Sequence, residues 1–217
     1  MIIPEFSCIV ADPPWMEKGG GKIKRGADRH YPLMHREEIL DTILRSPLYS
    51  PAEDAHLYMW VTNNFLLDGL EVMRRMGFTY KTNLVWAKSS FGLGYYFRGK
   101  HELCLFGVKG KGSIPRTEGR SCPSLFEAPK AAHSVKPDRF YEVAEARTRG
   151  PRLELFARTP RPGWWSWGGE VEGDELVHRG WDPTGEALSW GDLLQAHQSP
   201  LPPPPPLPAG GTPSERP

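Results

Sequence analysis

The sequence lacks several features that mark common classes of protein. It has no G-x-G-x-x-G after a predicted strand, so a dinucleotide-dependent dehydrogenase has little support. No apolar run approaches the roughly 20 residues of a membrane-spanning helix. The start, MIIPEFSC, lacks the basic flank and apolar core of a secretory signal. We therefore expect a cytoplasmic protein that does not associate with membranes.

Cysteine is also scarce. The three residues Cys8, Cys104 and Cys122 have no metal-ligand spacing, and their odd number does not suggest a disulfide framework. We expect reduced thiols and no metal site.

Charge nearly cancels overall, with a net value of +1, but it is unevenly distributed. Residues 18–31 and 81–120 are basic, whereas residues 170–192 are acidic. Locally basic loops suit a polyanion contacted at one place, although ordinary solvated loops are the simpler explanation for charge taken alone.

What the sequence does contain is an alternation of strand and helix patterns over most of its 217 residues. The predicted order is strand 7–12, helix 35–46, strand 55–61, a helix between Asn63 and Gly77, strands 80–88 and 101–109, helix 136–149, and strands 152–158 and 164–169. Asn63 is a candidate helix cap, and Gly77 ends that helix. Strands 80–88 and 101–109 are expected to form an antiparallel hairpin at the sheet edge.

This alternation predicts an α/β fold with a doubly wound, mostly parallel sheet. We expect a folded domain over residues 1–172, an acidic extension over 173–198 with a short helix from 185, and a Pro-rich tail over 199–217. The tail is either idle, which is the favoured interpretation, or a docking segment. Ligands of such sheets bind beyond the carboxyl ends of the strands, where Asp12, Asn63 and Arg158 are expected.

The stretch ADPPW, residues 11–15, follows the first apolar strand. Proline fixes its own φ and has no N–H to donate, so this turn is stiff and rich in acceptors. The Asp12 carboxylate and the Pro13 carbonyl supply two acceptors, which match an amino group, and Trp15 supplies a flat ring. A planar base with an exocyclic amine, adenine or cytosine, fits this arrangement. A Pro-rich turn carrying a core tryptophan is the alternative.

An amine conjugated with a ring is a poor nucleophile, because its lone pair is delocalised. Two aligned acceptors favour a tetrahedral nitrogen and stabilise the positive charge that develops on it. Stacking on an aromatic ring is worth about 1–3 kcal/mol per base. An amine inside a duplex cannot reach such a pocket, so the base must be single-stranded or flipped out.

Further segments follow in a fixed order: HYPLM, LYMWVTN, LVWAKS, YYFRGKHELCLFGVKG, HSVKPDRFYE, GPRLELFAR and RPGWWSWGGEV. Together with ADPPW they resemble the MT-A family, named for the seventy-kilodalton subunit of the eukaryotic messenger-RNA adenosine N6-methyltransferase. The resemblance covers residues 9–171 and includes bacterial and phage relatives. It implies a Rossmann-like methyltransferase fold with circularly permuted motifs, and S-adenosylmethionine as cofactor.

The resemblance also implies roles for individual residues. Catalysis falls to Asp12, Pro13, Pro14 and Trp15. The residues implied to contact the cofactor are Asp12, Lys100, Ser134, Lys136, Pro137, Glu154, Arg158, Gly169 and Glu170. Substrate contacts are implied for Trp15 and Tyr31. Further candidates for substrate contact come from their position and charge: Asn63 at a strand end, Arg98, and the loop cations Lys22, Lys24 and Arg25. Taken singly, several of these have simpler explanations: Glu154 alternates with Leu153 and Leu155 and could face solvent.

We therefore expect an adenine N6-methyltransferase that acts on a flipped or single-stranded base, with DNA favoured over RNA. A silent nucleic-acid-binding partner subunit and an enzyme acting on cytosine N4 are the alternatives. The compact form suggests a bacterial or phage protein. A homodimer and a heterodimer are both possible oligomeric states. Three departures from the family suggest weaker cofactor binding or a more exposed cofactor adenine: a short segment before ADPPW, Gly169 where relatives often have Asn, and Pro160-Arg161 after LELFAR.

Overall fold

A computed structural model describes residues 3–16, 33–92, 94, 96–111, 121–129, 135–168, 175–176 and 188–189. Its elements in chain order are β1 (Phe6–Ala11), α1 (Arg36–Arg45), β2 (Pro51–Val61), the 3-10 helix η2 (Asn63–Phe65), α2 (Leu66–Arg75), β3 (Thr79–Lys88), β4 (His101–Lys109), β5 (Leu125–Ala128), α3 (Asp138–Arg147), β6 (Arg152–Leu155), β7 (Trp165–Trp167), β8 (Glu175–Leu176) and β9 (Leu188–Ser189). Within these residues, no helix is long and apolar enough to cross a membrane.

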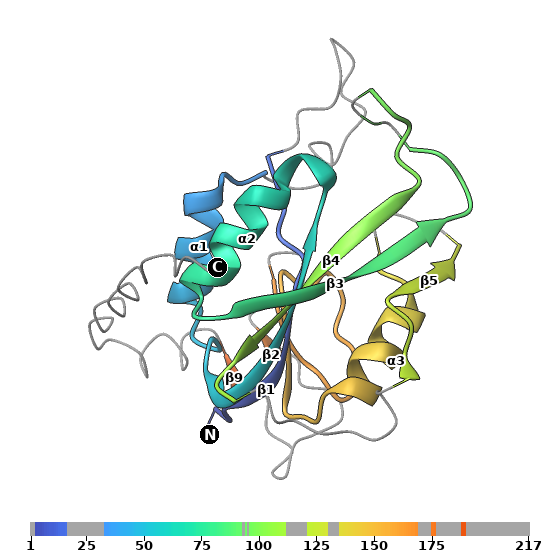
Figure 1. The fold of residues 1–217 in the computed structure, drawn as a ribbon. Helices are drawn as coiled ribbons and strands as arrows, with labels where there is room; N and C mark the ends of the chain where they lie inside the picture. The colour runs from blue at the N-terminus through green and yellow to red at the C-terminus, as the bar shows by residue number, and fades with distance from the viewer. Residues whose placement is uncertain are drawn as a thin grey trace, which may run out of the picture.

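Seven strands form one sheet in the order β5-β3-β4-β2-β1-β6-β7, and only β4 runs antiparallel to its neighbours. Helices α1 and α2 cover one face and α3 covers the other (Figure 1). The apolar run of β1 explains this arrangement, because Ile9 and Ala11 pack toward α1 and α2 whereas Cys8 and Val10 pack toward α3. The predicted doubly wound, mostly parallel sheet is confirmed.

Three details differ from the sequence prediction. The hairpin of β3 and β4 forms, but β5 pairs with β3 in parallel, so β5 rather than the hairpin is the sheet edge. Asn63 is not a helix cap: it begins η2, whose N-cap is Thr62 without a side-chain hydrogen bond. Leu188–Ser189 lie in the expected short helix, yet they form β9 and pair with β8.

Other boundaries are confirmed. Gly77 takes the left-handed φ of 85° after α2, and its N–H binds the carbonyl of Arg74, which is the expected helix stop. Pro137 is the N-cap of α3, where its missing N–H costs nothing. Residues 199–217, the Pro-rich tail, lie outside the described residues.

The parallel strands fix where a ligand site can form. The carboxyl ends of β1, β2, β3, β5, β6 and β7 lie at one edge of the sheet, and β4 begins there. Asp12 follows β1, and residues 156–161 follow β6, its hydrogen-bonded neighbour. The register places Ala11 opposite Leu155, so the two connections leave the sheet side by side.

Candidate active site

The turn after β1 is held by its own backbone. The N–H of Asp12 binds the carbonyl of Leu155 at 3.3 Å, which continues the ladder with β6. The Pro13 carbonyl accepts the N–H of Trp15 at 2.9 Å, and the Pro14 carbonyl accepts the N–H of Met34 at 2.7 Å. A carbonyl has two lone pairs, so the Pro13 oxygen keeps one acceptor position. The turn is rigid and begins with Asp12, whose carboxylate lies at the sheet edge.

Asp12 is paired with Lys136, which lies just before α3. The Lys136 ammonium donates to Asp12 Oδ2 at 2.6 Å and lies 3.6 Å from Glu102 Oε2. Burial alone would lower the pKa of Lys136, but the carboxylates of Asp12 and Glu102 outweigh burial and raise that pKa. Glu102 also pairs with Lys88, and its pKa falls because the two ammonium groups outweigh its burial. Asp12 therefore belongs to a partly buried network of alternating charges, with Lys136 as its buried member.

Glu154 lies at the end of β6, on the sheet face that α3 covers. It is 7% exposed, so the interpretation that it faces solvent is wrong. The hydroxyl of Tyr141, on α3, donates to Glu154 Oε1 at 2.5 Å. The pKa of Glu154 is raised to about 7, chiefly by burial and also by the nearby Asp12 charge, while the Tyr141 hydrogen bond partly opposes both.

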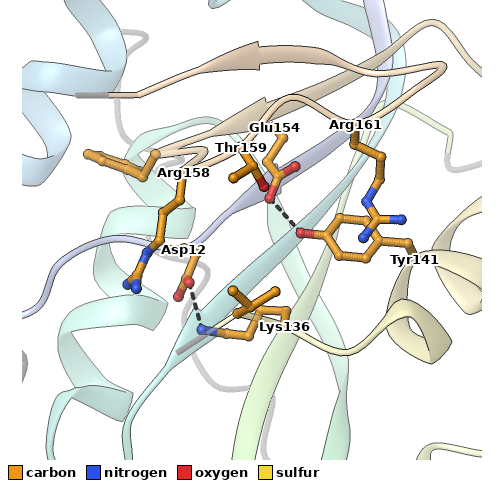
Figure 2. Close-up of a pocket in the computed structure, with 9 residues that line it drawn as sticks. Asp12, Lys136, Tyr141, Glu154, Arg158, Thr159 and Arg161 are labelled. Atoms are coloured by element: carbon orange, nitrogen blue, oxygen red, sulfur yellow. Dashed lines mark hydrogen bonds and ion pairs between the residues drawn. The ribbon is translucent and has the colours of Figure 1, made fainter. Parts of the chain in front are cut away.

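One pocket joins these groups, as Figure 2 shows. It is lined by Asp12, Val135, Lys136, Tyr141, Glu154, Phe156, Arg158, Thr159 and Arg161. Its wall carries two carboxylates and three cations, with the apolar side chains of Val135 and Phe156 between them. Such a mixed lining suits a ligand that bears charges of both signs, hydroxyl groups and a flat apolar part.

The connection from β6 shapes one wall of the pocket. Phe156 has a φ of 63°, a left-handed value that is rare for an aromatic residue and marks a constrained position. The Arg161 guanidinium lies 3.6 Å from the centre of the Tyr141 ring and pairs with Asp138 at 2.7 Å. Arg161 thus covers the ring whose hydroxyl holds Glu154 (Figure 2).

The structure brings together some of the predicted site residues. Asp12, Lys136, Glu154 and Arg158 line the pocket, and Pro137 begins the helix beside it. The exposed residues Asn63, Arg98 and Lys100 are not among the lining residues. Lys22, Lys24, Arg25, Tyr31, Ser134, Gly169 and Glu170 lie outside the described residues, so their predicted roles stay predictions.

The environment of Trp15 differs from the expected open ring. Its side chain is 5% exposed and belongs to the core on the α1 and α2 face. Its Nε1–H donates to the carbonyl of Trp60 at 2.9 Å, and its ring stacks on Phe65 at 5.7 Å between centroids. The alternative of a core tryptophan thus describes this structure better, because the Trp60 carbonyl and the Phe65 ring hold the Trp15 ring inside. Base stacking on Trp15 stays a prediction.

Sequence reasoning missed four contributors. Tyr141 and Arg161 line the pocket, and Glu102 and Lys88 extend the charge network of Asp12. Arg161 was noticed only as a departure that weakens cofactor binding, whereas it packs on Tyr141. A signal for Tyr141 exists, because it lies on the buried face of α3 with a polar end that needs a partner.

Comparison with known proteins adds independent support. The MT-A70 family profile matches residues 6–170, most of the chain. The chain belongs to the MT-A70 family. Membership agrees with the resemblance of the eight ordered motifs, and the matched region contains Asp12, Lys136 and Glu154.

The chain is similar to several proteins that are named as methyltransferases or as MT-A70-like. A type II methyltransferase, M.MunI, from Mycoplasma sp is 29% identical over 79% of this chain and 80% of its own length. The human N(6)-adenosine-methyltransferase catalytic subunit METTL3 is 27% identical over 81% of this chain, and the MT-A70-like protein of Arabidopsis thaliana is 26% identical over 82%. The chain spans only 30% and 26% of those two eukaryotic proteins.

Proposed function

We propose that this chain transfers the methyl group of S-adenosylmethionine to the N6 amine of adenine in nucleic acid, with DNA preferred over RNA. The observation that carries the proposal is the Asp12 carboxylate at the end of β1, fixed by the rigid Pro13-Pro14 turn and facing the pocket that Glu154 and Lys136 also line. Family membership and the names of the relatives support the reaction class.

The residues of the pocket fit the cofactor. S-adenosylmethionine carries an amino group, a carboxylate, a sulfonium, a ribose diol and a purine. Glu154 has a second oxygen beyond the one bound to Tyr141, and a carboxylate can accept from two ribose hydroxyls. Lys136 and Arg158 supply positive charge for the cofactor carboxylate, and Asp12 supplies negative charge for its amino group.

The bound cofactor supplies an electrophilic methyl group, and the protein positions the amine. Asp12 and the Pro13 carbonyl would accept the two N–H groups of the adenine amine, which favours the tetrahedral nitrogen of the transition state. Their rigidity matters, since a group that needs no reorganisation stabilises developing charge best. Lys136 keeps Asp12 in position through its 2.6 Å bond.

Support for the substrate differs between relatives. The Mycoplasma type II methyltransferase, which matches over most of both lengths, supports DNA. The human adenosine methyltransferase subunit supports RNA. We favour DNA because the similarity to the Mycoplasma protein extends over 80% of its length, and we propose a bacterial or phage origin on the same ground.

The test is transfer of a labelled methyl group from S-adenosylmethionine to single-stranded DNA and RNA of matched sequence. Mass spectrometry of the product nucleosides then identifies the modified base. We expect N6-methyladenine, formed faster in DNA. N4-methylcytosine as the product would contradict the target. Cofactor binding without transfer to either polymer would favour the silent partner subunit instead.

A further inference from the structure

The connection between β3 and β4 exposes aromatic rings to solvent. We name residues 89–100 the aromatic loop; the structure describes all of them except residues 93 and 95. Phe91 is 69% exposed, Tyr96 is 96% exposed and Phe97 is 86% exposed. Of the seven exposed large hydrophobic side chains in the described part of the chain, three lie in this loop. Large rings held in water at one place mark a binding surface.

Positive charge accompanies these rings. Arg98 and Lys100 are exposed, and residues 89–101 contain no Asp or Glu. The Lys100 ammonium lies 5.5 Å from the centre of the Phe91 ring, where it is attracted to the ring face. Rings and cations without acidic neighbours are the combination that binds single-stranded nucleic acid: the bases stack and the phosphates pair.

The loop is held in shape by its backbone. The N–H of Lys88 binds the carbonyl of Lys100 at 2.9 Å, and the N–H of Gly92 binds the carbonyl of Gly99 at 2.6 Å. Gly94 packs so closely that a Cβ there would lie 1.9 Å from the Phe97 carbonyl oxygen. These contacts fix the described backbone at Gly92, Gly94 and Gly99, which reduces the ordering that Tyr96 and Phe97 need on binding and so preserves affinity.

The aromatic loop projects beyond the sheet at the edge where the chain leaves β2 for α2 (Figure 1). This is the edge that carries Asp12. Neighbouring strands lie about 4.8 Å apart, so β3, three positions from β1, is about 14 Å away. At about 3.4 Å per stacked base, that distance corresponds to about four nucleotides. The ion pairs of Lys88, Glu102 and Lys136 line the same path to Asp12.

We propose that the aromatic loop binds the single-stranded segment flanking the target base, by stacking its bases on Tyr96 and Phe97 and pairing its phosphates with Arg98 and Lys100. The proposal rests on the proposed function and specifies its substrate: a strand several nucleotides long, unpaired beside the target adenine. A protein partner would also cover exposed rings, but the lack of Asp and Glu in residues 89–101 favours a polyanion at the loop itself.

The test compares a labelled twelve-nucleotide single strand with a trinucleotide whose central base is adenine. The variant is Tyr96→Ala with Phe97→Ala, and the matched control is Tyr80→Ala, a half-exposed tyrosine near the other end of β3. Fluorescence anisotropy should show at least tenfold weaker binding of the long strand by the variant, because each stacked base contributes on the order of tenfold or more. The control should bind it as the unaltered protein does.

Two further measurements make the result specific. The trinucleotide ends before the loop, so the double variant and the unaltered protein should bind it within about twofold of each other, a difference smaller than that of one stacked base. Gly94→Ala keeps both rings but displaces the loop, and it should also weaken binding of the long strand. Thermal unfolding confirms that each variant is folded.

Three results would overturn the proposal: equal affinity of the double variant and the unaltered protein for the long strand, an equal loss for long and short substrates, or a changed oligomeric state in sedimentation with nucleic-acid affinity unchanged. Binding is measured without chemistry. Absence of methyl transfer by the unaltered protein would therefore contradict the proposed function. The binding comparison would still show whether the aromatic loop binds the flanking single strand.

Discussion

The two carboxylates of the pocket have contrasting surroundings. Asp12 begins a rigid Pro-containing turn and is bonded at 2.6 Å to the Lys136 ammonium, a full positive charge. Glu154 ends β6 under α3 and is bonded at 2.5 Å to the Tyr141 hydroxyl, a neutral donor. Burial raises the pKa of Glu154 to about 7, whereas the carboxylates beside Lys136 raise the pKa of that ammonium and keep it charged.

This contrast shows how one sheet edge provides two acceptors with different properties. An ammonium partner fixes the position of the carboxylate it binds, which suits a group that must stabilise charge in a transition state. A neutral donor in a buried site leaves a carboxylate able to titrate near neutral pH. We infer that Asp12 serves the chemical step and Glu154 serves cofactor binding.

The largest expected effect follows removal of the Asp12 charge. Asp12→Asn keeps the shape of the side chain, but the amide presents a donor where the adenine amine needs an acceptor. We expect the rate of methyl transfer to fall by about 10³-fold, the upper range for loss of one preorganised group. Single-turnover kinetics with labelled cofactor measure it. A rate within tenfold of the unaltered protein would contradict the role of Asp12.

Lys136→Met should have the next largest effect, because it leaves the partly buried carboxylates of Asp12 and Glu102 without their shared ammonium. Breaking a buried pair costs about 3 kcal/mol of the free energy of unfolding, measurable by urea denaturation. The rate of transfer should fall as Asp12 loses its position. The matched control is Lys88→Met, which removes an ammonium from Glu102 but none from Asp12. Equal loss of rate in both variants would contradict the positioning of Asp12 by Lys136.

Glu154→Gln should weaken cofactor binding by about tenfold or more above pH 8, because hydrogen bonds to a charged group contribute about 1.5–3 kcal/mol. The groups facing Glu154 are Tyr141, Asp12, Arg161 and Lys136. Only ionised Glu154 accepts from both ribose hydroxyls, so affinity in the unaltered protein should rise as pH increases through about 7. Calorimetric titration between pH 6 and 9 measures this slope, which the variant should lack.

Ionisation of Glu154 should also change the stability of the protein, in the direction opposite to its effect on cofactor affinity. The folded pKa of Glu154, about 7, exceeds its ordinary value of 4.5, so the folded protein binds more protons between these values. The contribution of Glu154 is therefore fully present below pH 4.5 and is lost as pH rises through about 7. Without cofactor, the difference in unfolding free energy between the unaltered protein and Glu154→Gln should change in that window. A constant difference would contradict the raised pKa.

Tyr141→Phe should have the smallest effect on cofactor affinity. It tests the contrast between the two carboxylates by removing only the neutral donor of Glu154. The ring that packs against Arg161 remains, but the hydroxyl that donates to Glu154 is removed. Because that hydrogen bond lowers the pKa of Glu154, its loss should move the midpoint of the cofactor-affinity profile to higher pH. Affinity near pH 9 should largely recover. An unmoved midpoint with uniformly weaker binding would indicate a packing role only.

Much of this arrangement could be predicted from the sequence, because local patterns determine it. The apolar residues of β1 on both faces predicted a buried parallel strand, and the Asp12 that follows it lies at the carboxyl edge as expected. The helix stop at Gly77 and the helix start at Pro137 depend on backbone properties of those residues alone.

The rest depends on packing between distant segments. The Tyr141 and Glu154 bond requires α3 to lie over β6, which no local pattern specifies. Trp15 follows two prolines, and its inward orientation depends on the Trp60 carbonyl of β2 and the Phe65 ring. Only four residues form β5, a signal too short to show that a strand extends the sheet beyond the hairpin.

The most direct test of this division of roles is a single-turnover comparison of Asp12→Asn and Glu154→Gln at saturating S-adenosylmethionine, with an adenine-containing single strand as substrate. The account predicts that saturation restores the rate of Glu154→Gln to near that of the unaltered protein, whereas Asp12→Asn stays about 10³-fold slower. Equal recovery of both variants, or equal failure of both, would contradict it.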